Sequence, residues 1–166
     1  MKLDSPGRLH PWGLPIFLAY LLCVLVASPA QSATATDFDL DDYAGRVVVL
    51  DFWASWCVPC RRSFPWLNAM HEKYAHDGLV IVGVNLDLER TEAERFLAEF
   101  PASFRIVYDD KQALARQFDL IAMPSTYLIG RDGKVFDQHA GFKVREQAEY
   151  EAAIVSALSQ AGTENE

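Results

Sequence analysis

Between residues 47 and 86, two stretches that are apolar on both faces flank one stretch with helical periodicity. Val47–Trp53 and Leu79–Leu86 are rich in β-branched residues, which is typical of strands that helices cover on both sides. Between them the apolar residues have the spacing of an amphipathic helix, at Phe64, Leu67, Met70 and Tyr74. Gly78 marks the end of this predicted helix.

The alternation of strands and helices continues to the end of the chain. Further helices are predicted at Thr91–Phe100, Lys111–Phe118 and Arg145–Gln160. Further strands are predicted at Phe104–Tyr108, Ser125–Ile129 and Lys134–His139, and a short one around Phe38–Leu40. From the strand at Val47 onward, the order β-α-β-α-β-α-β-β-α predicts one α/β domain whose central sheet is flanked by helices on both faces.

The first thirty residues have the pattern of an export signal. Lys2 and Arg8 precede the apolar stretch Leu14–Ala27, and the small residues Ser28-Pro-Ala30 follow it. A basic start, an apolar core and small residues before a cleavage point are typical of a secretory signal peptide. The apolar region can be extended from Trp12 to Ala30, so an uncleaved membrane anchor remains an alternative.

We therefore expect residues 1–30 to be a signal peptide or N-terminal anchor and residues 31–166 to form the domain. The protein is then periplasmic or otherwise extracytoplasmic, and it is soluble after cleavage or anchored by its N-terminal segment. Its length of 166 residues suits one domain. The net charge of −8, with only Arg61-Arg62 adjacent among the basic residues, argues against nucleic-acid binding.

The most informative motif is Cys57-Val-Pro-Cys60, between the strand at Val47–Trp53 and the helix that follows. Pro59 is favoured at the first position of a helix, so Cys57 is expected at the helix N-terminus. Unpaired N–H groups and the helix dipole favour negative charge there, which lowers a cysteine pKa and makes the thiolate available. Thiolate is the attacking species in disulfide exchange. The motif predicts a redox-active pair, with Cys57 attacking and Cys60 resolving.

Other uses of two cysteines are weaker. A zinc site needs four ligands, and His71, His76 and His139 do not have ligand spacing, so we predict no metal site. A purely structural disulfide closes too small a loop to restrict the unfolded chain much. Two thiolates are soft ligands for Cu(I), so a copper carrier remains an alternative function, as does a non-catalytic docking module.

Two further positions are candidates for the site. Asp51 interrupts an apolar strand six positions before Cys57 and is expected to point inward beneath the helix start. Burial raises a carboxyl pKa, which suits Asp51 to exchange a proton with Cys60; the alternative is a hydrogen-bonded structural carboxylate at the sheet margin. Pro124, just before the strand at Ser125–Ile129, marks a strand start or a turn, and the residues alone favour a trans bond before it.

These residues together resemble the thioredoxin superfamily, and within it the TlpA-like and ResA-like extracytoplasmic thioredoxins. The resemblance rests on Asp51-Phe-Trp-Ala-Ser-Trp-Cys-Val-Pro-Cys60, Pro65, Gly83-Val-Asn-Leu-Asp87 and Met123-Pro-Ser-Thr-Tyr-Leu-Ile-Gly-Arg-Asp-Gly133. It covers nearly all of residues 37–160. It implies a thioredoxin fold with a mixed sheet.

The resemblance also implies roles for individual residues. Pro124 would be the cis-proline that faces the dithiol, and the backbone of Met123 would pair with an extended substrate segment. Trp56 would line the rim of the site, and Pro65 would kink the helix that carries Cys60. The candidate catalytic residues are thus Cys57, Cys60, Asp51 and Pro124, and the substrate-binding ones are Trp56 and Met123.

The chain departs from its relatives at three positions. Asp51 stands where many TlpA-like proteins have asparagine, and Ser63 where ResA-like members often have glutamate. Gly83 replaces the lysine that partners this aspartate in thioredoxin, so we expect Asp51 to titrate higher still.

The expected function is an extracytoplasmic thiol–disulfide oxidoreductase that needs no cofactor and acts mainly as a reductant of client proteins with cysteine pairs. By resemblance, the clients are apocytochrome c haem-site cysteines or the copper-binding thiols of oxidase assembly factors. A membrane thiol reductant would supply the electrons.

Overall fold

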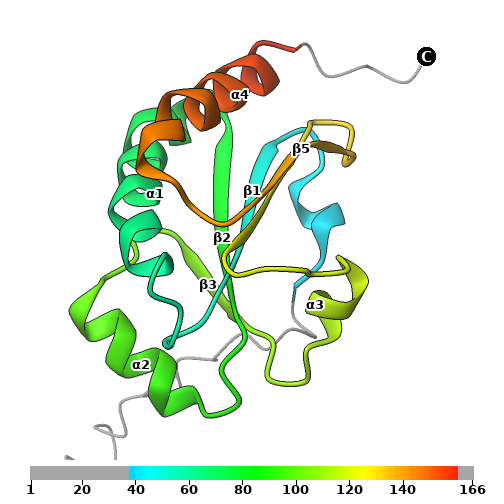
Figure 1. Ribbon diagram of the computed structural model, residues 1–166. Coiled ribbons are helices and arrows are strands. Elements are labelled where there is room, and N and C mark those ends of the chain that lie inside the picture. Colours follow the sequence, from blue (N-terminus) through cyan, green and yellow to red (C-terminus); the bar gives the residue numbers. More distant parts are fainter. Residues whose placement is uncertain (1–37, 161–166) are drawn as a thin grey trace, which may run out of the picture. The chain divides into compact units, whose positions relative to one another are not determined.

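Five strands form a mixed sheet at the centre of residues 38–160, the part of the chain that this computed structural model describes (Figure 1). The strand order is β3-β2-β1-β4-β5. β1 pairs in parallel with β2 and antiparallel with β4, β2 pairs in parallel with β3, and β4 pairs antiparallel with β5. The strands are β1 Val47–Trp53, β2 Leu79–Asn85, β3 Arg105–Tyr108, β4 Ser125–Ile129 and β5 Val135–Ala140.

Four α-helices connect and follow these strands in the predicted order. They are α1 Cys60–Tyr74, α2 Arg90–Glu99, α3 Ala113–Gln117 and α4 Gln147–Ser159. Three short 3₁₀ turns accompany them, η2 Leu40–Tyr43, η3 Ala75–Asp77 and η4 Val144–Glu146. The α/β fold predicted from the alternating pattern, with its mixed sheet, is confirmed.

The short strand expected around Phe38–Leu40 was wrong. Asp39 instead caps η2, because its side chain accepts the N–H of Asp41 at 3.0 Å. A short acidic side chain that bonds the backbone two residues on favours a turn over a strand. Phe38 is still buried, against the sheet face that α3 covers.

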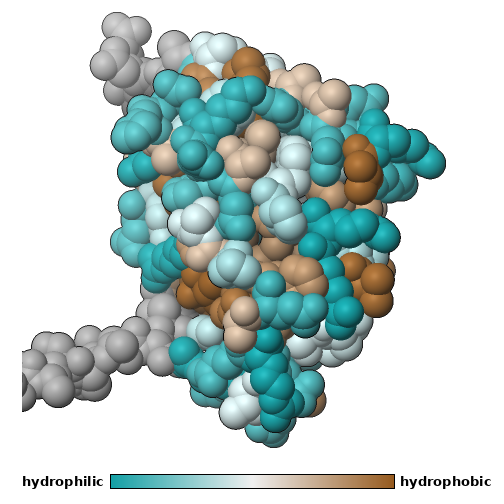
Figure 2. Space-filling view, turned by 90° about the vertical axis from the view of Figure 1, so that its left-hand side faces the viewer, coloured by the Kyte–Doolittle hydropathy of each residue, from teal (hydrophilic) through white to brown (hydrophobic). Residues whose placement is uncertain are grey.

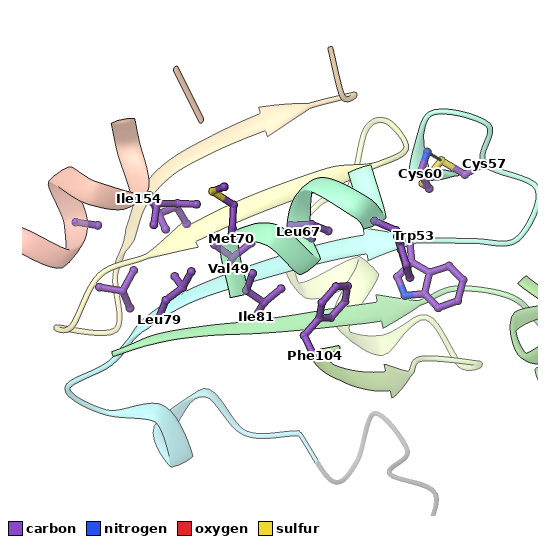
Figure 3. Close-up of a cluster of buried hydrophobic side chains, with 14 of the residues drawn as sticks. Val49, Trp53, Cys57, Cys60, Leu67, Met70, Leu79, Ile81, Phe104 and Ile154 are labelled. Carbon is purple, nitrogen blue, oxygen red and sulfur yellow. Dashed lines mark hydrogen bonds between the residues drawn. A yellow bond between two sulfur atoms is a disulfide. The ribbon is translucent and has the colours of Figure 1, made fainter. Parts of the chain in front are cut away.

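Helices cover both faces of the sheet, as the doubly apolar strands predicted. Buried residues of α1, α2 and α4 pack on one face, and Leu114 of α3 packs on the other (Figure 1). All seven residues of β1 are buried. Figure 3 shows the cluster on the first face, with Cys57 and Cys60 at one end of it and Leu79 and Ile154 toward the other. The outer surface on the α1 side is mostly polar, with apolar side chains in small separate patches (Figure 2).

The start of α1 lies at the candidate site, and a short turn follows its end. α1 begins at Cys60, one residue later than predicted, and Pro59 is its N-cap with helical φ and ψ. After α1 the turn η3 ends at Gly78, whose φ of +99° lies in the left-handed region that favours glycine. Pro65 lies inside α1, and the kink expected there stays a prediction.

The leader expected at residues 1–30 lies outside the described residues. Within residues 38–160, no helix is long and apolar enough to cross a bilayer.

Candidate active site

A disulfide joins Cys57 and Cys60 where the chain passes from β1 into α1, with an S–S distance of 2.05 Å (Figure 3). The two sulfur-bearing residues differ in exposure, since Cys60 is 0% exposed and Cys57 retains 3%. The N–H of Cys60, the first residue of α1, donates to the Sγ of Cys57 at 3.3 Å. Cys57 thus precedes the helix by three residues, and its sulfur accepts a hydrogen bond from the helix start. A hydrogen bond of this kind at the start of a helix favours a thiolate over a thiol.

The loop that carries Trp56 is tied to the end of β2 by a buried carboxylate. Asp87 accepts the backbone N–H of Ser55 at 2.9 Å and its hydroxyl at 2.8 Å. The amide of Asn85 donates to the same carboxylate at 2.7 Å. The sequence prediction missed this contact. Its only signal was the Gly83–Asp87 run, which does not show that Asp87 meets Ser55.

Asp51 lies in the middle of the sheet, where it is 1% exposed. It pairs with Gly83 on β2 and with Thr126 on β4. The hydroxyl of Thr126 donates to Oδ1 at 2.6 Å, and Oδ2 has no hydrogen-bond partner among the described residues. Burial raises the pKa of Asp51 from 3.8 to about 7, and the bond from Thr126 lowers it in part. The predicted inward orientation is therefore correct, and the residue lies on a central strand rather than at the sheet margin.

Gly83 has no space for a longer side chain. A Cβ at this position would lie 3.0 Å from Ile106 Cδ1 and from Phe104 Cε2, and 3.1 Å from the indole nitrogen of Trp53. Aromatic packing thus fills the place where thioredoxin, by resemblance, carries a lysine. Without that cation, burial decides the pKa of Asp51.

The peptide bond between Met123 and Pro124 is cis, as the resemblance implied. Ser125 pairs with Phe52, so Pro124 lies at the end of β1 from which the active-site loop starts. Pro124 is buried, and its carbonyl accepts the N–H of Gly141 at 2.7 Å. The cis-proline is thus placed beside the active-site loop.

Trp56 and Met123, the two predicted substrate-binding residues, line one groove. The groove has a volume of about 950 Å³ and is completed by residues of α3 and the segment before Pro124, including Arg116, Leu120 and Ile121. On its other side Trp56 borders a smaller hollow of about 260 Å³ that α2 helps to form. The indole is 65% exposed between the two hollows.

Nothing in this arrangement resembles a metal centre. Among residues 38–160, no three His, Cys, Asp or Glu side chains are grouped so as to hold a metal ion.

Ser63, which stands where ResA-like proteins often have glutamate, is buried and donates its hydroxyl to the carbonyl of Cys60 at 3.1 Å.

A mixed sheet that places a CxxC disulfide at a helix start, next to a cis-proline, defines a thiol–disulfide oxidoreductase of the thioredoxin superfamily. The chain belongs to the Redoxin family, whose model matches residues 26–154.

Two curated relatives and one solved structure support this assignment. The chain is 30% identical over 129 residues to thiol-disulfide oxidoreductase ResA of Bacillus thuringiensis subsp. konkukian, covering 75% of each chain. It is 31% identical over 138 residues to ResA of Geobacillus kaustophilus, covering 80% of this chain and 79% of the relative. A crystal structure of a protein assigned as thiol:disulfide interchange protein DsbE from Chlorobium tepidum aligns with a TM-score of 0.73 at 44% identity, covering 77% of this chain and 92% of that one. The protein is therefore a thiol–disulfide oxidoreductase of the ResA and DsbE type, and its partners are client cysteines.

Proposed function

We propose that this oxidoreductase acts outside the cytoplasm as a reductant of client disulfides, with Cys57 as the attacking sulfur and Cys60 as the resolving one. The observation that carries the assignment of the two sulfur atoms is the contact between the N–H of Cys60 and the Sγ of Cys57 at 3.3 Å, while the reducing direction and the location rest on the resemblance to extracytoplasmic thioredoxins. This contact favours charge on Cys57, while Cys60 is the more enclosed of the two residues.

Exchange proceeds in two steps from the reduced protein. The Cys57 thiolate attacks one sulfur of a client disulfide, so that a mixed disulfide forms and the other client sulfur leaves as a thiolate. Cys60, as its thiolate, then attacks the Cys57 sulfur, which forms the Cys57–Cys60 bond and releases the second client sulfur. Two electrons pass to the client, whose thiolates take up protons from their surroundings.

Asp51 is proposed to accept the proton of Cys60 in the second step. A base is most effective when its pKa lies near the working pH, and the pKa of Asp51 is raised to about 7 by burial. The buried carboxyl of Asp51 also lies on the sheet face that α1 covers, and α1 begins at Cys60.

Client binding is assigned to the groove between Trp56 and Met123. An extended client segment can pair with the Met123 backbone while its side chains contact the exposed indole. Pro124 cannot donate a backbone hydrogen bond, so Met123 is the residue at this point whose backbone can pair with the client chain.

The clients proposed are apocytochrome c haem-site cysteines or the copper-binding thiols of oxidase assembly factors. A membrane thiol reductant returns the protein to its dithiol form. The signal-like pattern of residues 1–30 and the resemblance to extracytoplasmic thioredoxins support this location and these partners.

The direction of exchange is tested by equilibrating the Cys57–Cys60 couple against glutathione. A potential near roughly −270 mV supports a reductant, whereas one near roughly −120 mV would make the protein an oxidant. In parallel, the reduced protein should reduce insulin, and Cys57→Ser should abolish that activity. Tight stoichiometric Cu(I) binding with negligible exchange would instead favour a copper carrier.

A further inference from the structure

Four residues on neighbouring strands lie in register beneath the helix that carries Cys60. Gly83 on β2 pairs with Asp51 on β1, Asp51 pairs with Thr126 on β4, and Thr126 pairs with His139 on β5. Side chains alternate along a strand, so Asp51 shares its face with Val49 and Trp53, which belong to the cluster packed under α1 and α4. Thr126, next to Leu128 of the same cluster by the same alternation, is 5% exposed.

The two buried polar side chains of this row make one short hydrogen bond. Thr126 Oγ1 donates to Asp51 Oδ1 at 2.6 Å, a length typical of a hydroxyl bonded to a carboxylate. A threonine hydroxyl has one proton, so the bond leaves it no proton for another acceptor. Oδ2 has no partner among the described residues, and the two carboxyl oxygens are therefore not equivalent.

We propose that Thr126 is a positioning residue for disulfide exchange, which holds the ionised carboxylate of Asp51 in one orientation and leaves Oδ2 as the oxygen that takes the proton. This inference rests on the proposed role of Asp51. Thr126 itself contacts neither sulfur in the proposed steps and acts only through the carboxyl group.

Among the groups around Asp51, Thr126 is the one that favours the ionised form of the Asp51 carboxyl. Burial raises the Asp51 pKa, and the hydrogen bond from Thr126 is what lowers it. Gly83 contributes no side chain on β2. On β5, burial lowers the pKa of His139, so this ring is neutral at neutral pH. From α4, Tyr150 stacks on His139 with ring centroids 4.0 Å apart, and burial raises its pKa, so it too is neutral.

Thr126 also lines a small cavity. A cavity of about 20 Å³ is lined by Thr126, by Asp137 and His139 of β5, and by Trp66 and Tyr150, so that Asp137 is the acidic group on its lining. A space of this size accommodates about one water molecule. There is therefore little free volume beside Thr126, which limits the rearrangement expected from Thr126→Val.

The experiment compares Thr126→Val, which removes the hydroxyl, with Thr126→Ser, which keeps it. Asp51 is titrated by carboxyl ¹³C NMR in the full-length reduced protein, using Asp51→Asn to assign its signal. Thr126→Val should raise the Asp51 midpoint by about one pH unit, equivalent to about a tenfold change in the protonation constant, and Thr126→Ser should stay close to wild type. An unchanged midpoint in Thr126→Val, or an equal shift in both variants, would overturn the proposal.

The pH profile of exchange provides the second readout. Thr126→Val should slow insulin reduction about fivefold near pH 7, where the ionised fraction of Asp51 falls by that factor, and approach the wild-type rate well above the new midpoint. In an Asp51→Asn background, the same substitution should cause no further change, because the carboxylate that Thr126 orients is gone. A pH-independent loss, or one that persists with Asp51→Asn, would indicate a merely structural role. If the wild type reduces no client, the proposed function fails while the titration still decides whether Thr126 controls Asp51.

Discussion

The two faces of β1 differ in the side chains that they bury. On the face beneath α3, Val48, Leu50 and Phe52 are buried and wholly apolar. On the face beneath α1, Val49 and Trp53 flank the buried carboxyl of Asp51.

The difference separates packing from chemistry within a single element. The apolar face stabilises the fold by removing hydrocarbon from water. The other face gives up some of that stabilisation, because an ionised carboxylate is costly to bury. It gains a group whose pKa of about 7 suits proton transfer beneath the CxxC helix.

The largest effect on stability is expected from Phe52→Ala on the apolar face. Phe52 is fully buried and contacts the rings of Phe118 and Tyr127. Removing the ring leaves a cavity, so we expect a loss of about 3–5 kcal/mol in urea unfolding. The folded fraction should keep the Asp51 titration midpoint of wild type. A large shift of that midpoint would show that the two faces are not independent.

Asp51→Asn should change stability in the opposite direction at neutral and alkaline pH. Because the folded pKa of about 7 lies above the unfolded value of 3.8, the folded protein binds more protons between these values. Wild type should therefore lose roughly 4 kcal/mol relative to Asp51→Asn as the pH rises through this window. Unfolding curves at pH 4 and pH 8 measure the difference.

An exposed aspartate provides the control for that comparison. Asp42→Asn lies in η2, away from the sheet interior, and should follow the pH dependence of wild type. A stability difference between wild type and Asp51→Asn that is the same at both pH values would contradict the assigned pKa.

A smaller loss of unfolding free energy is expected when the carboxylate of Asp87, which accepts hydrogen bonds from the active-site loop, is removed. Asp87→Ala leaves the N–H of Ser55 and the amide of Asn85 without their acceptor, which should cost about 1–3 kcal/mol. Insulin reduction should also slow, because the loop that places Trp56 and Cys57 is released. Ser55→Ala removes only the hydroxyl bond and should have a smaller effect on both readouts. Equal effects of the two substitutions would contradict the view that the Asp87 carboxylate holds the loop through several hydrogen bonds.

The smallest change in stability is expected at Trp56, whose side chain is mostly exposed. Trp56→Ala should alter the unfolding free energy by less than about 0.5 kcal/mol. It should raise KM for a protein client several-fold, with little change in kcat, since the groove loses one wall. Leu88→Ala, an exposed apolar residue that does not line this groove, is the matched control. Equal changes in KM for both variants would show that the client does not bind in this groove.

Local patterns predicted most of the fold because they are repeated along each element. β1 and β4 have the predicted bounds, and the run at Leu79 ends one residue early, at Asn85. Asp51 could be singled out because a carboxyl stands out within an apolar strand. The cis form of the Met123–Pro124 bond required the resemblance, since the residues alone favour trans.

Thr126 and Asp87 could not be found in the same way. Threonine is an ordinary strand residue, and its importance depends on the register between β1 and β4. Asp87 follows β2 in a loop, and its partner Ser55 lies 32 positions earlier in the chain. Such contacts between distant segments leave no periodic signal in the sequence.

The most direct test of the sulfur assignment is to trap the mixed disulfide. The reduced Cys60→Ser variant is mixed with a client disulfide and analysed by mass spectrometry, beside Cys57→Ser as its counterpart. If Cys57 is the attacking sulfur, Cys60→Ser accumulates a stable client adduct at Cys57, and Cys57→Ser forms almost none. Adducts that form equally fast at Cys60 in the Cys57→Ser variant would contradict the assignment.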